Sequence, residues 1–279
     1  MAYRLVCIDV DGTLLNSKHK ITPRTKDVLL KAHRQGVHIV ISTGRMYTDA
    51  EYYSNLIGVK SPVIASNGAF IKEKDCDKVI FKDVLGEKLS LELLEIFRRH
   101  NTRPYFCTPH KFYYGNIMFK FFHILARLLG VRSNNLDIEF VYSWQRWRQV
   151  LCKERDNMVK CELIFKDAAL IDDLRNELKT IDRLEIVDSS KYNIEITRKG
   201  VSKGKAVEML ASLYNVKREE VLTIGDSEND LSMIEYAGLG VAMGNASDVI
   251  KAKADYITDT NDNDGVAEVI SKFILNKNI

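Results

Sequence analysis

The stretch Leu5-Val6-Cys7-Ile8-Asp9-Val10-Asp11-Gly12-Thr13-Leu14 decides the fold of this chain of 279 residues. Its first four residues are an uninterrupted apolar run, which is typical of a strand buried on both faces. Asp9 and Asp11 follow directly, so two carboxylates lie where a buried strand ends. Buried carboxylates cost free energy unless they are paired, hydrogen-bonded or bound to a metal. Their position therefore indicates a cation site.

Two further strands follow the first one and end in small or polar residues. Residues 37–41 form an apolar run that stops at Ser42-Thr43-Gly44-Arg45, and residues 62–65 form a shorter run that stops at Ser66-Asn67-Gly68. Helical patterns separate these runs. Strands that alternate with helices and have continuous apolar sequences predict a parallel α/β sheet.

The same alternation returns near the end of the chain. The strand predicted at 221–224 stops at Gly225-Asp226-Ser227, and the one at 239–242 stops at Met243-Gly244-Asn245. In an open parallel sheet the carboxyl ends of the strands lie along one edge, where ligands bind. We therefore expect residues that are distant in the sequence to form one site.

The middle of the chain does not keep this rhythm. We predict a Rossmann-like core formed by residues 1–84 and 193–279, and an inserted α+β domain formed by residues 85–192. Strand-like stretches at 160–165 and 184–187 belong to the insertion. An insertion that leaves and returns at the carboxyl edge is expected to cover the site as a lid and to set substrate specificity.

Composition excludes several classes of protein. The net charge of +3 is too small to indicate a nucleic-acid partner, and the five cysteines are scattered, which is typical of free thiols in a reducing compartment. The apolar segment 117–130 is too short to span a membrane and is interpreted as an amphipathic helix. No leader segment is recognised before the first strand. We expect a cytoplasmic protein without a membrane or nucleic-acid partner, and the sequence does not indicate an oligomeric state.

Four carboxylates are expected at the ligand-binding edge: those of Asp9, Asp11, Asp226 and Asp230. They repel one another unless a cation holds them. Because all these ligands are oxygen atoms, Mg²⁺ is favoured over zinc.

The surroundings favour a phosphate ligand. Thr43 and Gly44 lie where a strand turns into a helix, so backbone N–H groups can receive an anion. Lys203 follows Ser202 at another helix start and supplies a positive charge. A magnesium ion, a lysine and a helix N-terminus around one point predict a phosphoryl-transfer site.

Four segments together resemble the motifs of the haloacid dehalogenase-like phosphatases, specifically the Cof-type branch with a type IIB cap. Asp9–Leu14 resembles the first motif and Ser42–Arg45 the second, while Gly200–Gly204 and Gly225–Asp230 resemble the third and fourth. They occur in order and span the whole predicted core. The inserted domain resembles the family only in size and placement.

The resemblance implies a role for each residue. Asp9 would be the nucleophile that forms an aspartyl-phosphate, and Asp11 would protonate the leaving oxygen and then activate water. The magnesium ion would be held by the Asp9 carboxylate, the Asp11 backbone carbonyl and Asp226, with support from Asp230. Val10 separates the two acids and directs their side chains differently. The phosphate-binding residues would be Val10, Thr43, Gly44, Lys203 and Asn229.

Several alternatives stay open at the level of sequence. Asp230 and Thr43 could be helix caps, Asn67 could touch phosphate but is interpreted as a turn residue with Gly68, and Arg45 could contact substrate or solvent. A phosphomutase on the same core, or a phospho-acceptor without turnover, would use the same Asp9. Small sugar phosphates are the default substrates, while nucleotides, phosphorylated flavin precursors and pyridoxal phosphate are further possibilities.

Overall fold

The structure is a computed structural model in which the chain forms two compact units. Unit 1, here called the core unit, contains residues 1–45, 50–81 and 201–279, and unit 2, the cap unit, contains residues 46–49 and 82–200. The described residues are 3–74, 76–117, 137–165, 169–187 and 193–275.

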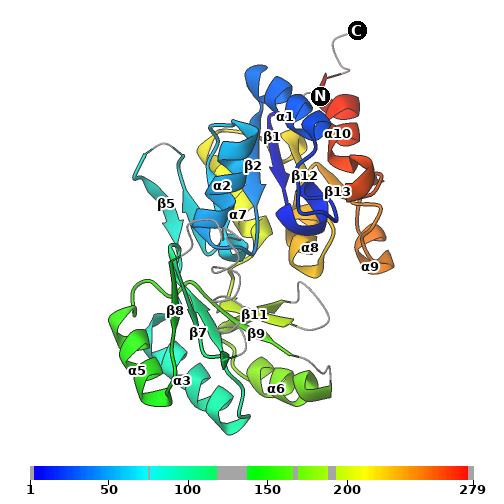
Figure 1. Cartoon of the computed structure of the whole chain (residues 1–279). Coiled ribbons are helices and arrows are strands. Elements are labelled where there is room, and N and C mark those ends of the chain that lie inside the picture. The colour runs from blue at the N-terminus through cyan, green and yellow to red at the C-terminus, as the bar shows by residue number, and fades with distance from the viewer. Residues whose placement is uncertain (1–2, 75, 118–136, 166–168, 188–192, 276–279) are drawn as a thin grey trace. The chain divides into compact units, whose positions relative to one another are not determined.

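The core unit is built on one sheet, in which eight described strands have the order β14-β13-β12-β1-β2-β3-β4-β5 (Figure 1). Their bounds are β1 (Leu5–Ile8), β2 (His38–Ser42), β3 (Val63–Ala65), β4 (Phe70–Lys72), β5 (Val79–Lys82), β12 (Val221–Gly225), β13 (Leu239–Ala242) and β14 (Tyr256–Ile257). The strand β1 lies at the centre and pairs in parallel with β12 and β2. The predicted parallel core is confirmed. The sheet also contains β4, which is antiparallel to β3 and which the strand–helix rhythm did not predict.

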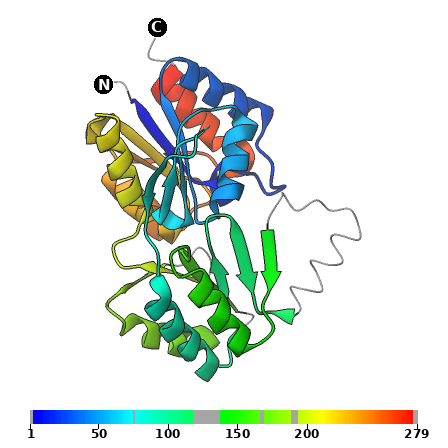
Figure 2. The same cartoon turned by 90° about the vertical axis from the view of Figure 1, so that its left-hand side faces the viewer.

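Helices cover both faces of the core sheet. Their bounds are α1 (Pro23–Arg34), α2 (Tyr47–Ile57), α7 (Lys203–Leu213), α8 (Leu231–Tyr236), α9 (Asp248–Lys251) and α10 (Gly265–Ile270). Figure 2 shows α1, α2 and α10 on one side of the sheet and α7 and α8 on the other. On the α7 and α8 side, Leu5 and Cys7 of β1 pack against Val207, Leu210 and Met233. Apolar residues on both faces of β1 explain why its sequence has no polar interruption.

The cap unit contains a second sheet, in which six described strands have the order β10-β11-β9-β6-β7-β8. Their bounds are β6 (Tyr105–Cys107), β7 (Lys111–Tyr114), β8 (Asp137–Phe140), β9 (Lys160–Ile164), β10 (Leu184–Val187) and β11 (Asn193–Arg198). The pairs are antiparallel except for β7 with β8. This mixed sheet confirms the predicted α+β insertion.

Helices α3 (Gly86–Arg99), α5 (Trp144–Lys153) and α6 (Ala169–Lys179) complete the cap unit. Its hydrophobic core includes Phe97, Phe106, Trp147 and Ile196. Trp147 is therefore a core residue. Most of the helix expected at 117–130 lies outside the described residues.

The division of the chain differs by a few residues from the predicted boundaries. The strand β11 begins at Asn193, where the core was expected to resume, but it pairs with β9 and β10 in the cap sheet. The apolar pattern of β11 does not indicate which sheet the strand joins, which explains the difference.

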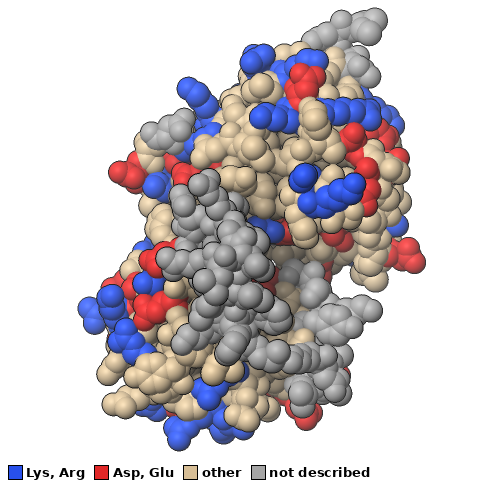
Figure 3. All heavy atoms as spheres, viewed as in Figure 1, with Lys and Arg blue, Asp and Glu red and all other residues tan. Residues whose placement is uncertain are grey.

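Two surface observations bear on possible partners. On the face drawn in Figure 3, the described basic and acidic side chains are interspersed and do not form an extended basic stripe. Within the described part of the chain, no helix has both the length and the apolar character that crossing a membrane requires.

Candidate active site

The carboxyl ends of three neighbouring core strands lie at the same level. Ile8 of β1 is paired with Ile224 of β12 on one side and with Ile41 of β2 on the other. The residues directly after Ile8, Ile224 and Ile41 therefore lie near the carboxyl edge of the sheet. Asp9 is the first of them, and its N–H donates to the Ile224 carbonyl at 3.0 Å. Segments that are distant in the sequence therefore meet where parallel strands end, as the strand pattern predicted.

Three carboxylates converge at this edge. Asp9, Asp226 and Asp230 each offer one oxygen atom, and these atoms all lie within 4.8 Å of one another. Lys203 joins the group: its Nζ lies 2.6 Å from Asp9 Oδ1 and 2.6 Å from Asp230 Oδ1. The Lys203 side chain is fully buried, so these ion pairs are shielded from solvent. We call these four residues the acidic cluster.

The loop after β12 holds its two carboxylates by short-range hydrogen bonds. Asp230 Oδ2 accepts the backbone N–H groups of Asp226 and Ser227, each at 3.0 Å. Asp226 accepts the Thr13 hydroxyl at 2.8 Å through Oδ1 and the Ser227 hydroxyl at 3.1 Å through Oδ2. Asp230 therefore fixes the loop backbone, as a capping residue does, and also belongs to the acidic cluster.

Glycine is required at position 12 by this packing. A Cβ atom there would lie 2.5 Å from Asp226 Oδ2, and the φ of Gly12 is +76°, a value that favours glycine. The turn after β1 can thus approach Asp226 closely. Asn245 Nδ2 donates to the Gly12 carbonyl at 2.8 Å and ties the end of β13 to the same turn.

The charges in the acidic cluster do not balance. Burial, followed by the neighbouring Asp230 carboxylate, holds the pKa of Asp9 well above its usual range, although Lys203 opposes the shift. Burial, together with Asp230, also raises the pKa of Asp226 to about 6. Burial disfavours the charged form of Lys203, but Asp230 and Asp9 outweigh it and raise the pKa of that ammonium group. Three carboxylates around one ammonium group leave an excess of negative charge.

This donor set fits a small divalent cation. The cluster supplies carboxylate oxygens from two strand ends, and oxygen ligands of this kind suit Mg²⁺. Burial and mutual repulsion raise the pKa of Asp9 and Asp226, and a bound cation would offset both effects. The residues present are therefore compatible with the predicted magnesium site.

Asp11 is not one of the three clustered carboxylates and pairs with Arg45 instead. The guanidinium donates from Nε to Asp11 Oδ2 and from Nη2 to Asp11 Oδ1, each at 2.7 Å. The Asp11 side chain is half exposed, in contrast to buried Asp9. The expectation that Val10 directs the two acids differently is confirmed.

The remaining predicted residues lie on the loops of the same core unit. Thr43 is buried directly after β2, and its Oγ1 accepts the Arg45 N–H at 3.2 Å. Gly44 follows in the bend before α2, and Val10 is buried between the two acids. Asn229 is buried in the loop after β12 and donates from Nδ2 to Asn67 Oδ1 at 3.2 Å.

The sequence did not predict four of the contacts in the site. Thr13 and Ser227 orient Asp226, Arg45 pairs with Asp11, and Asn67 contacts Asn229. Each of these residues lies within or beside a segment that follows a strand, and this position was the only sign in the sequence that it lies near the site. The partner of each side chain depends on loop geometry that residue spacing does not reveal.

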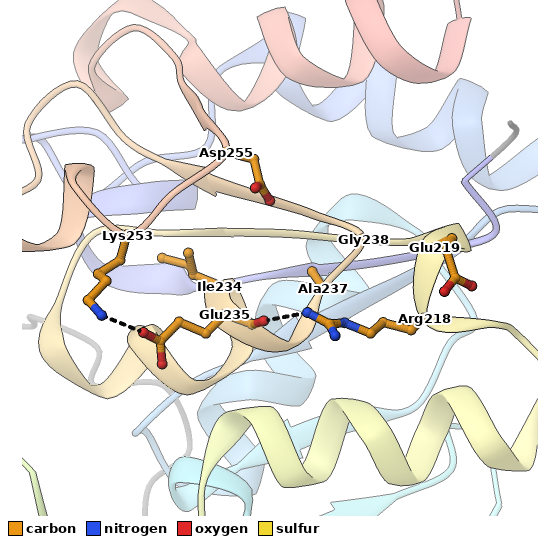
Figure 4. A pocket seen from close by; sticks show the side chains of 8 residues that line it. All are labelled: Arg218, Glu219, Ile234, Glu235, Ala237, Gly238, Lys253 and Asp255. Carbon is orange, nitrogen blue, oxygen red and sulfur yellow. Dashed lines mark hydrogen bonds and ion pairs between the residues drawn. The ribbon is translucent and has the colours of Figure 1, made fainter.

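A hollow of about 460 Å³ lies at the other edge of the core sheet, where the strands begin. Its lining comes from the segments that precede β12, β13 and β14, including Arg218, Glu235 and Lys253 (Figure 4). The Arg218 guanidinium donates to the Glu235 carbonyl at 3.0 Å, and Lys253 pairs with the Glu235 carboxylate at 3.2 Å. Arg218, Glu235 and Lys253 are exposed or partly exposed, so this hollow lacks the buried charge of the acidic cluster.

Comparison with known proteins supports the assignment. A family model for haloacid dehalogenase-like hydrolases matches residues 6–270. The 5-amino-6-(5-phospho-D-ribitylamino)uracil phosphatase YcsE of Bacillus subtilis (strain 168) is 31% identical over 272 residues, which are 98% of this chain and 96% of the relative.

Solved structures agree with this result. A haloacid dehalogenase-like hydrolase from B. subtilis has a TM-score of 0.85 and 29% identity, with 97% of this chain and 100% of that chain covered. The subclass IIB sugar phosphatase BT4131 has a TM-score of 0.78 and 26% identity, with 97% and 98% covered. The chain thus belongs to the haloacid dehalogenase-like hydrolases, as a phosphatase of the Cof-type, subclass IIB branch that acts on small phosphorylated metabolites.

Proposed function

We propose that this phosphatase hydrolyses phosphomonoesters by a magnesium-dependent mechanism in which Asp9 forms an aspartyl-phosphate. The observation that carries the proposal is the acidic cluster: Lys203 binds Asp9 and Asp230 at 2.6 Å each, and Asp226 lies in the same group of carboxylates. Buried charge of this kind is costly for stability and is typical of catalytic sites.

The first step forms a bond between an Asp9 carboxylate oxygen and phosphorus. The bond between phosphorus and the ester oxygen breaks, and protonated Asp11 gives its proton to that oxygen. In the second step the Asp11 carboxylate takes a proton from water, whose oxygen attacks phosphorus. The Asp9–phosphorus bond breaks, so that Asp9 is regenerated as a carboxylate and inorganic phosphate leaves.

The surrounding residues orient the reactants. Lys203 holds one oxygen of Asp9 and thereby fixes the direction of the nucleophile. Thr43, the Gly44 and Val10 backbones, Lys203 and Asn229 bind the phosphoryl group. Asp9, the Asp11 backbone carbonyl and Asp226 would hold Mg²⁺, supported by Asp230, and the bound ion would neutralise charge on the transferring phosphoryl group.

Arg45 positions Asp11 in this scheme. Its guanidinium donates to both oxygens of Asp11 and thereby fixes the orientation of that side chain. The half-exposed position of Asp11 allows an incoming ester to compete for either partner.

The proposed substrates are small sugar phosphates or related polyhydroxylated phosphomonoesters. Two relatives support this class: BT4131 is named a sugar phosphatase, and YcsE is named for a substrate with a phosphoribityl group. A small phosphorylated metabolite is then the partner, and location in the cytoplasm stays a prediction.

A panel of phosphorylated metabolites, assayed with magnesium for release of inorganic phosphate, tests the proposal. Wild-type protein should also hydrolyse para-nitrophenyl phosphate, and Asp9→Asn should lose this activity by about 10⁴-fold or more. An Asp9→Asn protein as active as the wild type would refute the mechanism. A mutase would instead form an isomeric sugar phosphate when a sugar bisphosphate is added, and a phospho-acceptor would release no phosphate at all.

A further inference from the structure

The turn after β3 has an unusual backbone. Ser66, Asn67 and Gly68 have φ values of 51°, 58° and 99°, so three successive residues adopt the left-handed region. Only glycine adopts this region without cost. All three residues are buried, and the surrounding structure must therefore maintain the conformation.

Three contacts attach this turn to the loops of the active site. The Asn67 N–H donates to the Thr43 carbonyl at 3.1 Å, and the Ser66 N–H donates to the Arg45 carbonyl at 2.8 Å. On the other side, a Cβ atom at Gly68 would lie 2.4 Å from the Ser202 carbonyl oxygen, directly before Lys203. The turn thus lies between the second and third motifs.

The Asn67 side chain reaches the fourth motif. Its Oδ1 accepts a hydrogen bond from Asn229 Nδ2 at 3.2 Å, and the two residues are only 3% and 8% exposed. Within the described residues, Asn229 Oδ1 has no hydrogen-bond partner. The contact with Asn67 uses one of the two N–H donors of Asn229. Buried amide groups are normally satisfied, so an unpaired amide oxygen at the edge of the acidic cluster marks Asn229 as a residue that the fold alone does not satisfy.

We propose that Asn67 is a positioning residue for phosphoryl transfer. A carbonyl oxygen can only accept, so Asn67 Oδ1 requires Asn229 to present its NH₂ group and thereby selects the orientation of the Asn229 amide. The second N–H of Asn229 is then directed to the phosphoryl group. This inference rests on the proposed function, because it requires that Asn229 binds the phosphoryl group.

The variant Asn67→Gly tests the inference because glycine keeps the left-handed backbone and removes only the amide. The matched control is Ser66→Gly, which alters the neighbouring left-handed residue and removes a buried hydroxyl that has no hydrogen-bond partner among the described residues. Each variant is assayed with para-nitrophenyl phosphate, and its affinity for inorganic phosphate with magnesium is measured by calorimetry. Thermal unfolding is recorded for every variant.

Asn67→Gly should lower kcat/KM by about 10- to 100-fold and weaken binding of inorganic phosphate, while Ser66→Gly should stay within about 2-fold of the wild type. In an Asn229→Ala background, Asn67→Gly should have almost no further effect, because both changes remove one function. A lower unfolding temperature with unchanged kinetics and phosphate affinity would overturn the proposal. Multiplicative effects of Asn67→Gly and Asn229→Ala would also overturn it.

Failure of the inference and failure of the proposed function give different results. If the wild type turns over and Asn67→Gly matches it in rate and phosphate affinity, only the role of Asn67 is wrong. If the wild type neither hydrolyses phosphomonoesters nor binds phosphate, both are wrong.

Discussion

Two buried lysines, one in each unit, make nearly the same ion pairs. In the core unit, Lys203 lies between Asp9 and Asp230, at 2.6 Å from each. In the cap unit, Lys160 lies 3.1 Å from Glu195 and 3.5 Å from Glu162. In both places burial disfavours the ammonium ion, and the neighbouring carboxylates outweigh it and raise the lysine pKa.

The two groups differ in what surrounds the lysine. The core group contains a third carboxylate, Asp226, and lies where parallel strands end. The cap group lies on paired strands, and Asn193 Nδ2 donates to Glu162 Oε1 at 3.2 Å. A buried lysine between two carboxylates is therefore not by itself a sign of catalysis. The surplus carboxylate at a strand end distinguishes the active site from a structural ion pair.

The largest expected effect is on activity at Lys203. Lys203→Met should reduce kcat/KM for para-nitrophenyl phosphate by about 10²- to 10³-fold or more, because it removes a charged donor from the nucleophile and the phosphoryl group. The matched change Lys160→Met should leave this rate within about 3-fold of the wild type, measured below its unfolding temperature. Equal losses in the two variants would contradict the distinction between the groups.

The next effect concerns the metal. Asp226→Asn should raise the magnesium concentration needed for half-maximal activity by about 10- to 100-fold, because it removes one carboxylate ligand. Glu162→Gln, which removes a carboxylate from the cap group, should not change the magnesium requirement. Titration of activity with MgCl₂ after treatment with a chelator measures both.

Magnesium should also stabilise the folded protein. At about 100 times its dissociation constant, a ligand that binds only the native state adds about 2.7 kcal/mol. We expect a higher unfolding temperature with magnesium than with chelator in the wild type, and a clearly smaller increase in Asp226→Asn. If magnesium raised the unfolding temperature equally in both proteins, the ion would bind at a site other than the acidic cluster.

The cap group should contribute to stability rather than to chemistry. Lys160→Met leaves buried Glu195 and partly buried Glu162 without their cation and should cost roughly 3–5 kcal/mol of unfolding free energy, measured in urea. Adding Glu195→Leu to it should recover part of this loss, since an apolar pair can replace a buried ion pair. The corresponding double change at Lys203 and Asp230 should not recover activity.

The smallest effect is expected at the hollow on the opposite edge of the core sheet. Lys253 and Glu235 are each more than half exposed, with side-chain exposures of 58% and 52%. Lys253→Ala should therefore change the unfolding free energy by less than about 1 kcal/mol and leave turnover unchanged. A larger effect on turnover would show that this edge communicates with the active site.

Much of the core site could be predicted because residues that follow parallel strands lie at one known edge of the sheet. Continuous apolar runs identified β1, β2 and β12, and the residues after them, Asp9, Thr43 and Asp226, lie at the carboxyl edge as expected. That rule needs only local sequence and the geometry of parallel sheets.

The cap unit and the directions of several side chains could not be predicted in the same way. Its strands are short and mostly antiparallel, and β6 (Tyr105–Cys107) pairs with the distant strand β9 as well as with its neighbour β7. The pairing of Arg45 with Asp11 depends on how the loop after β2 bends. Residue spacing carries no information about either feature.

The central claim is that Asp9 becomes phosphorylated, and the variant Asp11→Asn tests it most directly. Para-nitrophenolate leaves without needing a proton donor, so the first step should proceed while the second stalls. Rapid mixing with para-nitrophenyl phosphate and magnesium should give a burst of about one equivalent of product per active site. Mass spectrometry should then locate one phosphoryl group on Asp9. A phosphoryl group on another residue, or the same burst from Asp9→Asn, would contradict the account.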